Sequence, residues 1–282
     1  MGAGAGRSRL APVTGTPTPP RAALVLLGAG SGTRSGHRTN KVFLSLAGRR
    51  VFVWTLDATR DDPDIGPVVL VVRADERDAA REVLAREAPG RQVRIVVGGA
   101  SRHASESRAL QALRPDVERG EVDVVVIHDA ARPLSGPALF RRVVAEARTY
   151  GGAVPGRVQP ALLHRDGFSQ RDGDAVAVQT PQAFSSRPLL RAYAAADRDG
   201  FEGSDTAACV ERFAPEVFIR HVPGSPANIK ITYAEDLFLA EALVARSGYD
   251  IHRLGLPAVD GPTALNASRG VPAGRASRAR GR

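Results

Sequence analysis

The sequence predicts an α/β fold in which a mostly parallel, twisted sheet is covered by helices on both faces. Four short runs of apolar, mainly β-branched residues are continuous rather than alternating, which is typical of strands buried on both sides. They span residues 22–27, 67–72, 93–97 and 122–127. Amphipathic stretches lie between them, and this β-α-β-α order favours parallel strands joined by helical crossovers.

The helices are predicted from apolar residues at helical spacing. We expect them at residues 50–59, 76–86, 105–113, 137–149 and 234–245. Residues 155–178 break the pattern with Pro, Gly and paired charges, and they predict an irregular arm that protrudes from the sheet. Because such sheets bind ligands outside the carboxyl ends of their strands, the chemistry is expected just after Leu27, Val97 and Ile127.

The net charge of +9 on 282 residues raises the question of a nucleic-acid-binding face. Most of this charge lies in terminal segments rich in Gly, Ala, Pro, Ser and Arg. Residues 1–21 carry three arginines and no acid, and residues 255–282 carry five arginines and one aspartate. Such compositions bury too little apolar surface to become ordered. We therefore expect disordered tails at 1–21 and 248–282, one domain at 22–247, and no organised nucleic-acid site.

Composition also bears on the compartment. The longest apolar runs are far shorter than the roughly 20 residues that span a bilayer. The Thr- and Pro-rich start lacks the apolar core of a signal peptide. The single Cys209 excludes an internal disulfide framework and suits a reducing environment. We expect a cytoplasmic protein without membrane association.

The first candidate site is a glycine-rich loop after the first strand. Glycines let the backbone approach a ligand and present N–H groups to phosphate oxygens, and two cations follow where a triphosphate would lie. A dinucleotide fingerprint is excluded because position 33 is Thr, and a P-loop because no Gly-Lys-Ser/Thr ending is present. A plain turn explains the loop equally well when it is taken alone. Its residues are Gly28, Ala29, Gly30, Gly32, Arg34 and Lys41.

The second candidate site follows the third strand. Gly98 and Gly99 form a tight turn, and Ser105 is placed to present a hydroxyl near the start of the next helix. Capping of this helix by Ser101 or Ser105 is the structural alternative.

Two further candidate sites contain charged side chains. Asp129 and Arg132 follow the most apolar strand, where Asp129 could ligate Mg²⁺ or a ribose hydroxyl and Arg132 could pair with a phosphate. A structural Asp–Arg pair is the alternative. His128 is interpreted as structural, since no Ser or Cys nucleophile pattern accompanies it. Lys230, the one charge in a short apolar strand at 228–232, either reaches solvent or points at an anion.

Together and in this order, the motifs resemble a family: the cytidylyltransferase of the non-mevalonate isoprenoid pathway, which acts on 2-C-methyl-D-erythritol 4-phosphate. The resemblance covers about residues 22–244. It implies a single Rossmann-like nucleotidyltransferase domain. It rests on the glycine loop with Lys41, on Gly98-Gly99 with Arg102 and Ser105, and on residues 128–133, 179–182 and 228–232.

The resemblance also implies residue roles. Arg34 and Lys41 would stabilise the charge at the α-phosphorus, with Lys230 as a third catalytic residue, and Asp129 would hold Mg²⁺ or another divalent cation. The substrate's own phosphate would attack in line, pyrophosphate would leave, and the enzyme would be a homodimer. Substrate contacts would come from Arg132, Arg171 and Thr180. The CTP-binding residues would be Gly28, Ala29, Gly30, Gly32, Gly99, Ser105, Asp129 and Ala130.

The sequence departs from the family pattern on the acceptor side. After Pro155 the family has Val-x-Asp-Thr-x-Lys, whereas residues 156–161 read Gly-Arg-Val-Gln-Pro-Ala. Smaller departures are Ser204 for Thr and Asn40 for Pro. Two alternatives therefore stay open: an enzyme for another polyol phosphate such as ribitol 5-phosphate, and a non-catalytic nucleotide-binding paralogue.

Residues 248–254 read Gly-Tyr-Asp-Ile-His-Arg-Leu and resemble the opening of the cyclodiphosphate synthase of the same pathway, which some bacteria fuse to the cytidylyltransferase. Asp250 and His252 would be metal ligands there, but two ligands without the rest of a site cannot form a metal centre. We interpret the segment as the remnant of a fusion or as a truncated fusion, and chance similarity is the alternative.

Overall fold

The computed structural model describes residues 19–30, 40–159 and 175–246. Several predicted features lie outside the described residues: Gly32, Arg34, Arg171, nearly all of the two tails, and the middle of the arm.

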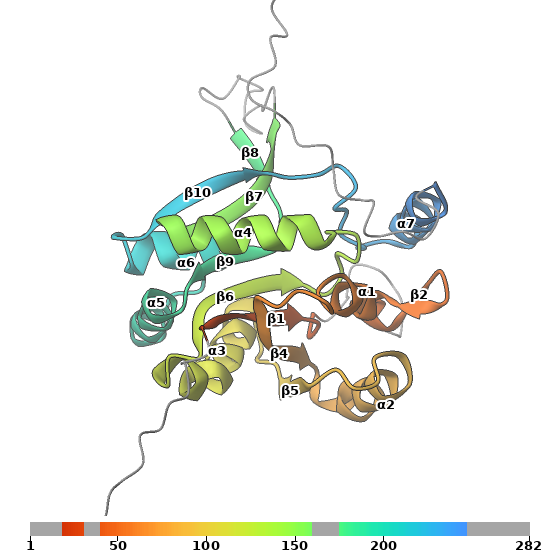
Figure 1. Ribbon diagram of the computed structural model, residues 1–282, viewed down its shortest axis with the longest axis horizontal. Coiled ribbons are helices and arrows are strands. Elements are labelled where there is room, and N and C mark those ends of the chain that lie inside the picture. Colours follow the sequence, from red (N-terminus) through yellow and green to blue (C-terminus); the bar gives the residue numbers. More distant parts are fainter. Residues whose placement is uncertain (1–18, 31–39, 160–174, 247–282) are drawn as a thin grey trace, which may run out of the picture.

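Eight strands form one mixed sheet through the centre of the molecule (Figure 1). Seven follow the order β10-β7-β9-β6-β1-β4-β5, and β8 pairs with β7. On this path only β9 runs antiparallel to its neighbours. A short hairpin of β2 (Ser45–Leu46) and β3 (Arg49–Arg50) stands apart. The sheet strands are β1 (Arg21–Leu27), β4 (Ile65–Val72), β5 (Val93–Val97), β6 (Val122–Asp129), β7 (Gly151–Gln159), β8 (Ala175–Val178), β9 (Gln182–Ser185) and β10 (Phe218–Pro223).

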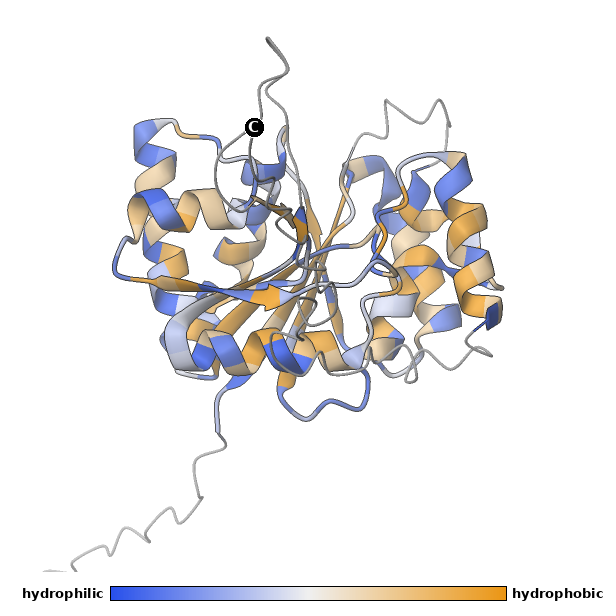
Figure 2. Cartoon of the chain, turned by 90° about the horizontal axis from the view of Figure 1, so that it is seen from above, coloured by the Kyte–Doolittle hydropathy of each residue, from blue (hydrophilic) through white to orange (hydrophobic). Residues whose placement is uncertain are grey.

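Helices cover both faces of the sheet. Apolar side chains of α1, α2 and α4 join one core cluster, and those of α3, α5 and α6 join the other. Within β1, Leu24 and Leu26 belong to the first cluster while Ala23 and Val25 belong to the second, because successive side chains alternate between faces. Both faces therefore require apolar residues, and Figure 2 shows the apolar strands between the helices. The helices are α1 (Val51–Ala58), α2 (Arg77–Glu87), α3 (Arg102–Glu118), α4 (Pro137–Tyr150), α5 (Ser186–Asp199) and α6 (Thr206–Phe213).

A seventh helix in the described part of the chain, α7 (Ala234–Arg246), packs beside the β2–β3 hairpin. Its buried Ala240 and Val244 join a third, smaller cluster with Leu46, Trp54 and Ile231. This cluster holds the segment before α7 against the β2–β3 hairpin, α1 and Leu134 in the loop after β6.

The predicted α/β fold with a mostly parallel sheet is confirmed, with small shifts at the element ends. Two local predictions are wrong. The arm is not irregular where it is described, since β7 continues to Gln159 and β8 pairs antiparallel with it, using the β-branched Val158 and Val176. Residues 228–232 are not a strand, because only Ile231 bonds its N–H to a neighbouring chain segment, at Ala131.

Candidate active site

A cavity of about 780 Å³ opens at the carboxyl ends of β1, β5 and β6, where the sequence analysis places the chemistry. Its walls are the loops after these strands, the start of α3, and the 3-10 helix η1 (Lys41–Phe43). This volume is in the usual range for small-molecule sites. The lining includes eight predicted site residues, namely Gly28, Ala29, Gly30, Lys41, Gly99, Ser105, Asp129 and Lys230.

The glycine loop and the Gly98-Gly99 turn pack directly against neighbouring backbone and small side chains. A Cβ atom on Gly98 would lie 2.6 Å from the Cβ of Ala29, and one on Gly99 would lie 2.4 Å from the Cβ of Ala104. Neither separation is sterically possible. A side chain at Gly98 would push the two loops apart, and one at Gly99 would push the turn away from α3. The two loops thus form one continuous wall of the cavity.

The start of α3 faces this wall. Ser101 is its N-cap and accepts a hydrogen bond from the Ala104 N–H at 3.1 Å. The Ser105 hydroxyl accepts from the Gly99 N–H at 3.1 Å and donates to the Ser101 carbonyl at 2.9 Å. The positive end of the helix dipole therefore lies at the cavity, where it favours an anion.

Asp129, at the end of β6, is surrounded by cations. Its Oδ2 lies 2.8 Å from the Lys230 Nζ and 3.6 Å from the Arg132 Nε, and its Oδ1 pairs with the Arg102 Nη1. Burial alone would raise the pKa of this carboxyl, but the charges of Arg102 and Lys230 outweigh burial and hold the pKa well below its usual range. Asp129 is therefore ionised and organises the basic side chains of the cavity.

The chain contains two lysines, Lys41 and Lys230, among 39 basic residues, and both line this cavity. Arginine serves at every other basic position. An ammonium is a compact charge, whereas a guanidinium is a broad fork, so the two are not interchangeable at a tight anion site. Neighbouring residues fix the Lys230 segment: the Asn228 side chain donates to the Thr180 carbonyl at 2.8 Å, and Ile231 bonds to Ala131.

The family model described as "IspD: 2-C-methyl-D-erythritol 4-phosphate cytidylyltransferase" matches residues 22–246. The chain belongs to this family. The match covers the whole described body of the chain, including every cavity residue discussed above.

Individual relatives agree with this assignment. A 2-C-methyl-D-erythritol 4-phosphate cytidylyltransferase from Solibacter usitatus is 37% identical over 236 residues, covering 78% of this chain and 94% of the relative. The solved cytidylyltransferase of Thermus thermophilus is 30% identical with a TM-score of 0.60, covering 80% and 99%. A bifunctional IspD/IspF enzyme from Solidesulfovibrio magneticus is 40% identical over 256 residues, and the chain covers 61% of it. Such fused relatives are in line with the resemblance at residues 248–254.

Three predicted site residues are not brought to the cavity surface. Ala130 is fully buried in the core. The Arg132 Nη1 donates to the Asn228 carbonyl at 2.7 Å, so this guanidinium ties the Lys230 segment to Asp129. Thr180 is buried behind Asp129, and its hydroxyl accepts from the Asp129 N–H at 3.0 Å. Their described contacts are structural.

Arg102 belongs to the Gly98-Gly99 motif, but no role was predicted for it from the sequence. It lines the wall and contacts Asp129 from a different element, a pairing that spacing along the chain cannot predict. The scarcity of lysine is a signal that sequence reasoning could have used to single out Lys41 and Lys230 together.

Asn40 stands where the family has proline, and the structure explains the exchange. Its φ of −64° is the value that a proline ring imposes. Its side-chain amide also donates to the Gly28 carbonyl at 2.7 Å and to the Glu76 carboxylate at 3.1 Å. Asn40 therefore ties the residue before Lys41 to the glycine loop.

His128 is structural, as the sequence analysis interprets it. Its Nε2 lies 3.0 Å from the Arg132 carbonyl, which can only accept, so Nε2 carries the proton. Its Nδ1 then accepts from the Thr180 hydroxyl at 3.0 Å. Complete burial, opposed in part by Asp129, lowers the pKa of His128 to about 4. The neutral ring is the form that this network accommodates.

We expect His128 to make the fold acid-sensitive. Because its folded pKa of about 4 lies below the ordinary value of 6.5, its contribution is complete above pH 6.5 and is lost as the pH falls toward 4. The full loss is on the order of 3 kcal/mol. Urea unfolding of the unmodified chain and of His128→Gln across this range measures it: the difference between them should shrink with acid. Parallel curves would contradict the assignment.

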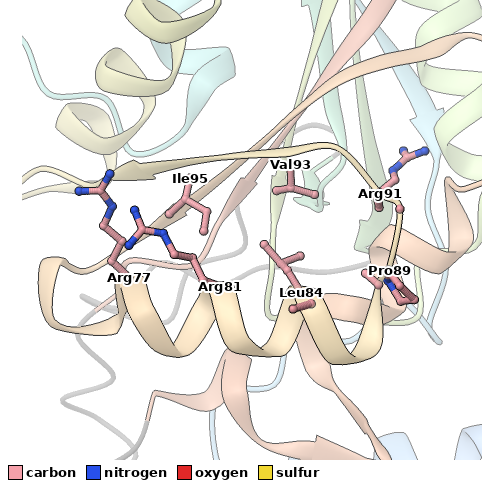
Figure 3. Close-up of a pocket in the computed structure, with 10 residues that line it drawn as sticks. Arg77, Arg81, Leu84, Pro89, Arg91, Val93 and Ile95 are labelled. Atoms are coloured by element: carbon pink, nitrogen blue, oxygen red, sulfur yellow. The ribbon is translucent and has the colours of Figure 1, made fainter.

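A second hollow lies between α2 and β5, on the edge of the sheet (Figure 3). Leu84, Val93 and Ile95 form an apolar floor. Of its arginines, Arg81 pairs with Asp78, and Arg91 donates to the carbonyls of residues 59 and 60. It contains none of the motif residues, so the chemistry is assigned to the first cavity.

Proposed function

We propose that this chain transfers CMP from CTP to 2-C-methyl-D-erythritol 4-phosphate and releases pyrophosphate, in the synthesis of isoprenoid precursors. One observation carries the proposal. Within the described residues, one carboxylate and four cationic side chains line the cavity formed by the two glycine turns. The carboxylate is Asp129, and the cations are Lys41, Arg73, Arg102 and Lys230. A net positive, backbone-lined cavity is suited to a nucleoside triphosphate.

In the proposed reaction, an oxygen of the acceptor phosphate attacks the α-phosphorus of CTP in line. A new P–O bond forms as the bond to the β-phosphate oxygen breaks, and the electron pair leaves with pyrophosphate. The serines that line the described part of the cavity include Ser101 and Ser105, whose hydroxyls are engaged in helix capping and in the Gly99 turn. Ser204 also lines the cavity. The step that we propose is direct transfer to the acceptor phosphate, without a covalent enzyme intermediate.

Catalysis then consists of positioning and charge stabilisation. Lys41 enters from η1 and Lys230 from the loop beside Asp129, so the two ammonium groups approach the cavity from different elements. Negative charge grows on the phosphoryl oxygens and on the leaving pyrophosphate, and both lysines are placed to counter it. Arg34, outside the described residues, is proposed to add a third cation.

The family resemblance implies a divalent cation. In the described ranges no group of three or more His, Cys, Asp or Glu side chains is arranged to hold a metal. Asp129, the one acid among the described lining residues, still fits Mg²⁺, which keeps several waters and takes other ligands from substrate phosphates. We infer that Asp129 would hold the ion together with CTP. When bound, the ion supplies neutralisation of phosphate charge.

We also propose a homodimer formed through the arm. In the β7–β8 ribbon, Val158 pairs with Val176 and Gly156 pairs with Val178, which places the three valines on one face. Val158 is 60% exposed and Val178 is 47% exposed. Apolar side chains exposed together on one face of a ribbon are typical of a protein–protein interface. Sedimentation should give a dimer for the unmodified chain and a monomer for Val158→Asp. A dimer that survives this change would place the interface elsewhere.

We also propose a cellular location for the protein. None of the helices in the described residues combines the length and apolar character that a bilayer crossing needs. The single Cys209 is buried and free, and burial raises the pKa of its thiol to about 12, which keeps it unreactive. The free, unreactive thiol and the phosphorylated substrates favour the cytoplasm.

A panel of acceptors tests the function. Purified protein is mixed with CTP, Mg²⁺ and either 2-C-methyl-D-erythritol 4-phosphate, ribitol 5-phosphate or other polyol phosphates, and pyrophosphate release is measured. We expect release with methylerythritol phosphate. Release only with another acceptor would overturn the substrate, and it would implicate residues 156–161. CTP binding without release for any acceptor would identify a non-catalytic paralogue.

A further inference from the structure

Glu106 is a buried carboxylate that none of the proposed steps uses. It lies on α3, one helical turn after Arg102, with an exposed fraction of 1%, and it does not line the cavity. An ionised side chain at such a position costs free energy unless its partners compensate for the lost water.

Three groups surround this carboxylate. The Thr206 hydroxyl donates to its Oε1 at 3.0 Å, the Tyr193 hydroxyl donates to its Oε2, and the Arg102 Nε lies 3.0 Å from its Oε1. Tyr193 is itself fixed, since it is buried and its ring stacks on His103 with centroids 4.6 Å apart. The core beneath α3 therefore holds Glu106 rigidly, and its carboxylate lies against the Arg102 guanidinium.

Arg102 in turn connects the core to the cavity. Its Nε faces Glu106 while its Nη1 contacts Asp129, so one guanidinium spans a core carboxylate and a cavity carboxylate. A guanidinium held at both ends loses the rotamer freedom of a free arginine. Asp129 also binds Lys230. The chain of contacts runs from the hydroxyl pair through Glu106 and Arg102 to Asp129 and one of the two cavity lysines.

We propose that Glu106 is a positioning residue for cytidylyl transfer: it fixes the orientation of Arg102 and thereby the charge arrangement that receives CTP. This inference rests on the function proposed above and adds a residue to it. Burial raises the pKa of Glu106, an effect that Arg102 and the two hydroxyl donors oppose. Two hydroxyls donate hydrogen bonds to the two carboxyl oxygens, and the Arg102 guanidinium lies within ion-pair distance, a set of partners that suits an ionised carboxylate.

The test is a double-mutant cycle on CTP binding, measured by titration calorimetry without acceptor. Glu106→Gln keeps the size of the side chain but removes its charge, and we expect about a tenfold rise in the Kd for CTP. In an Arg102→Gln background the same change should have no further effect, because Glu106 acts only through Arg102. Equal fold-changes in both backgrounds would show a general structural effect and overturn the proposal.

A second pair of changes tests the same link without replacing a charged residue. Tyr193→Phe combined with Thr206→Val removes the two hydroxyl donors to Glu106 and so loosens its side chain. We expect a smaller rise in the Kd that also vanishes in the Arg102→Gln background. Near-ultraviolet circular dichroism confirms that each variant is folded. CTP binding that is unchanged in every variant overturns the role of Glu106 and leaves the proposed function intact. Failure of the unmodified chain to bind CTP overturns the proposed function itself.

Discussion

Lys41→Ala should lower kcat by about 10²- to 10³-fold, with a much smaller change in the KM for CTP. Lys41 lines the cavity at the start of η1, directly after Asn40, whose amide fixes this segment to the glycine loop and to Glu76. The charge that Lys41 faces grows as pyrophosphate departs. An interaction that strengthens in the transition state changes kcat more than ground-state binding. Steady-state kinetics with saturating acceptor measures the two constants separately.

Two experiments control for the interpretation of Lys41→Ala. Lys41→Arg keeps the charge and, if a compact ammonium is required, should restore only part of the lost rate. Since Lys41 and Lys230 are the only lysines, reductive methylation can modify no other side-chain amine. CTP should protect both from the reagent. An unchanged kcat in Lys41→Ala would remove this residue from the mechanism.

Asp129→Asn should destabilise the fold by about 3–5 kcal/mol, because it leaves the charges of Arg102, Arg132 and Lys230 without their shared carboxylate. It should also weaken CTP binding, since the three cations lose the group that arranges them. The pKa of Asp129 is depressed, so its contribution is present above the ordinary carboxyl pKa and is lost as the pH falls through the lower folded value. Urea unfolding at neutral pH measures the stability.

A matched control lies on the same strand. Asp123 on β6 pairs with Arg148 at 2.8 Å, but both side chains are about one-third exposed to solvent. Asp123→Asn should therefore cost about 1 kcal/mol or less. Equal losses for the two variants would contradict the view that Asp129 is the centre of a buried charge cluster.

The central strands were predictable because β1, β4, β5 and β6 are buried on both faces and therefore apolar throughout. β9 was not, since it has four residues and follows a proline, and its place between β6 and β7 depends on long-range pairing. β10 is mostly exposed and lacks a clear pattern. The helix α5 was also not predicted, although the sequence does carry a helical pattern there. Its buried residues recur at helical spacing: Leu189, Ala192, Tyr193 and Ala196.

For the site, the sequence predicted the sheet edge at which the cavity opens, because the glycine turns and Asp129 each follow an apolar strand. It could not predict which cations meet there. The contact between Arg102 and Asp129 joins two elements, and the link from Arg102 to Glu106 depends on α5 and α6 beneath it. Thr180 was expected at the substrate because residues 179–182 are part of the family resemblance, but its hydroxyl bonds to His128 and Asp129.

Cytidylyl transfer can be measured directly by ³¹P NMR of a mixture of this protein, CTP, Mg²⁺ and 2-C-methyl-D-erythritol 4-phosphate. We expect the three CTP signals and the phosphomonoester signal to decline together. They should be replaced by pyrophosphate and by a coupled pair of signals from a new cytidine diphosphate ester. A phosphomonoester signal that persists while CTP remains intact, with the protein folded and CTP bound, would contradict the proposed transfer.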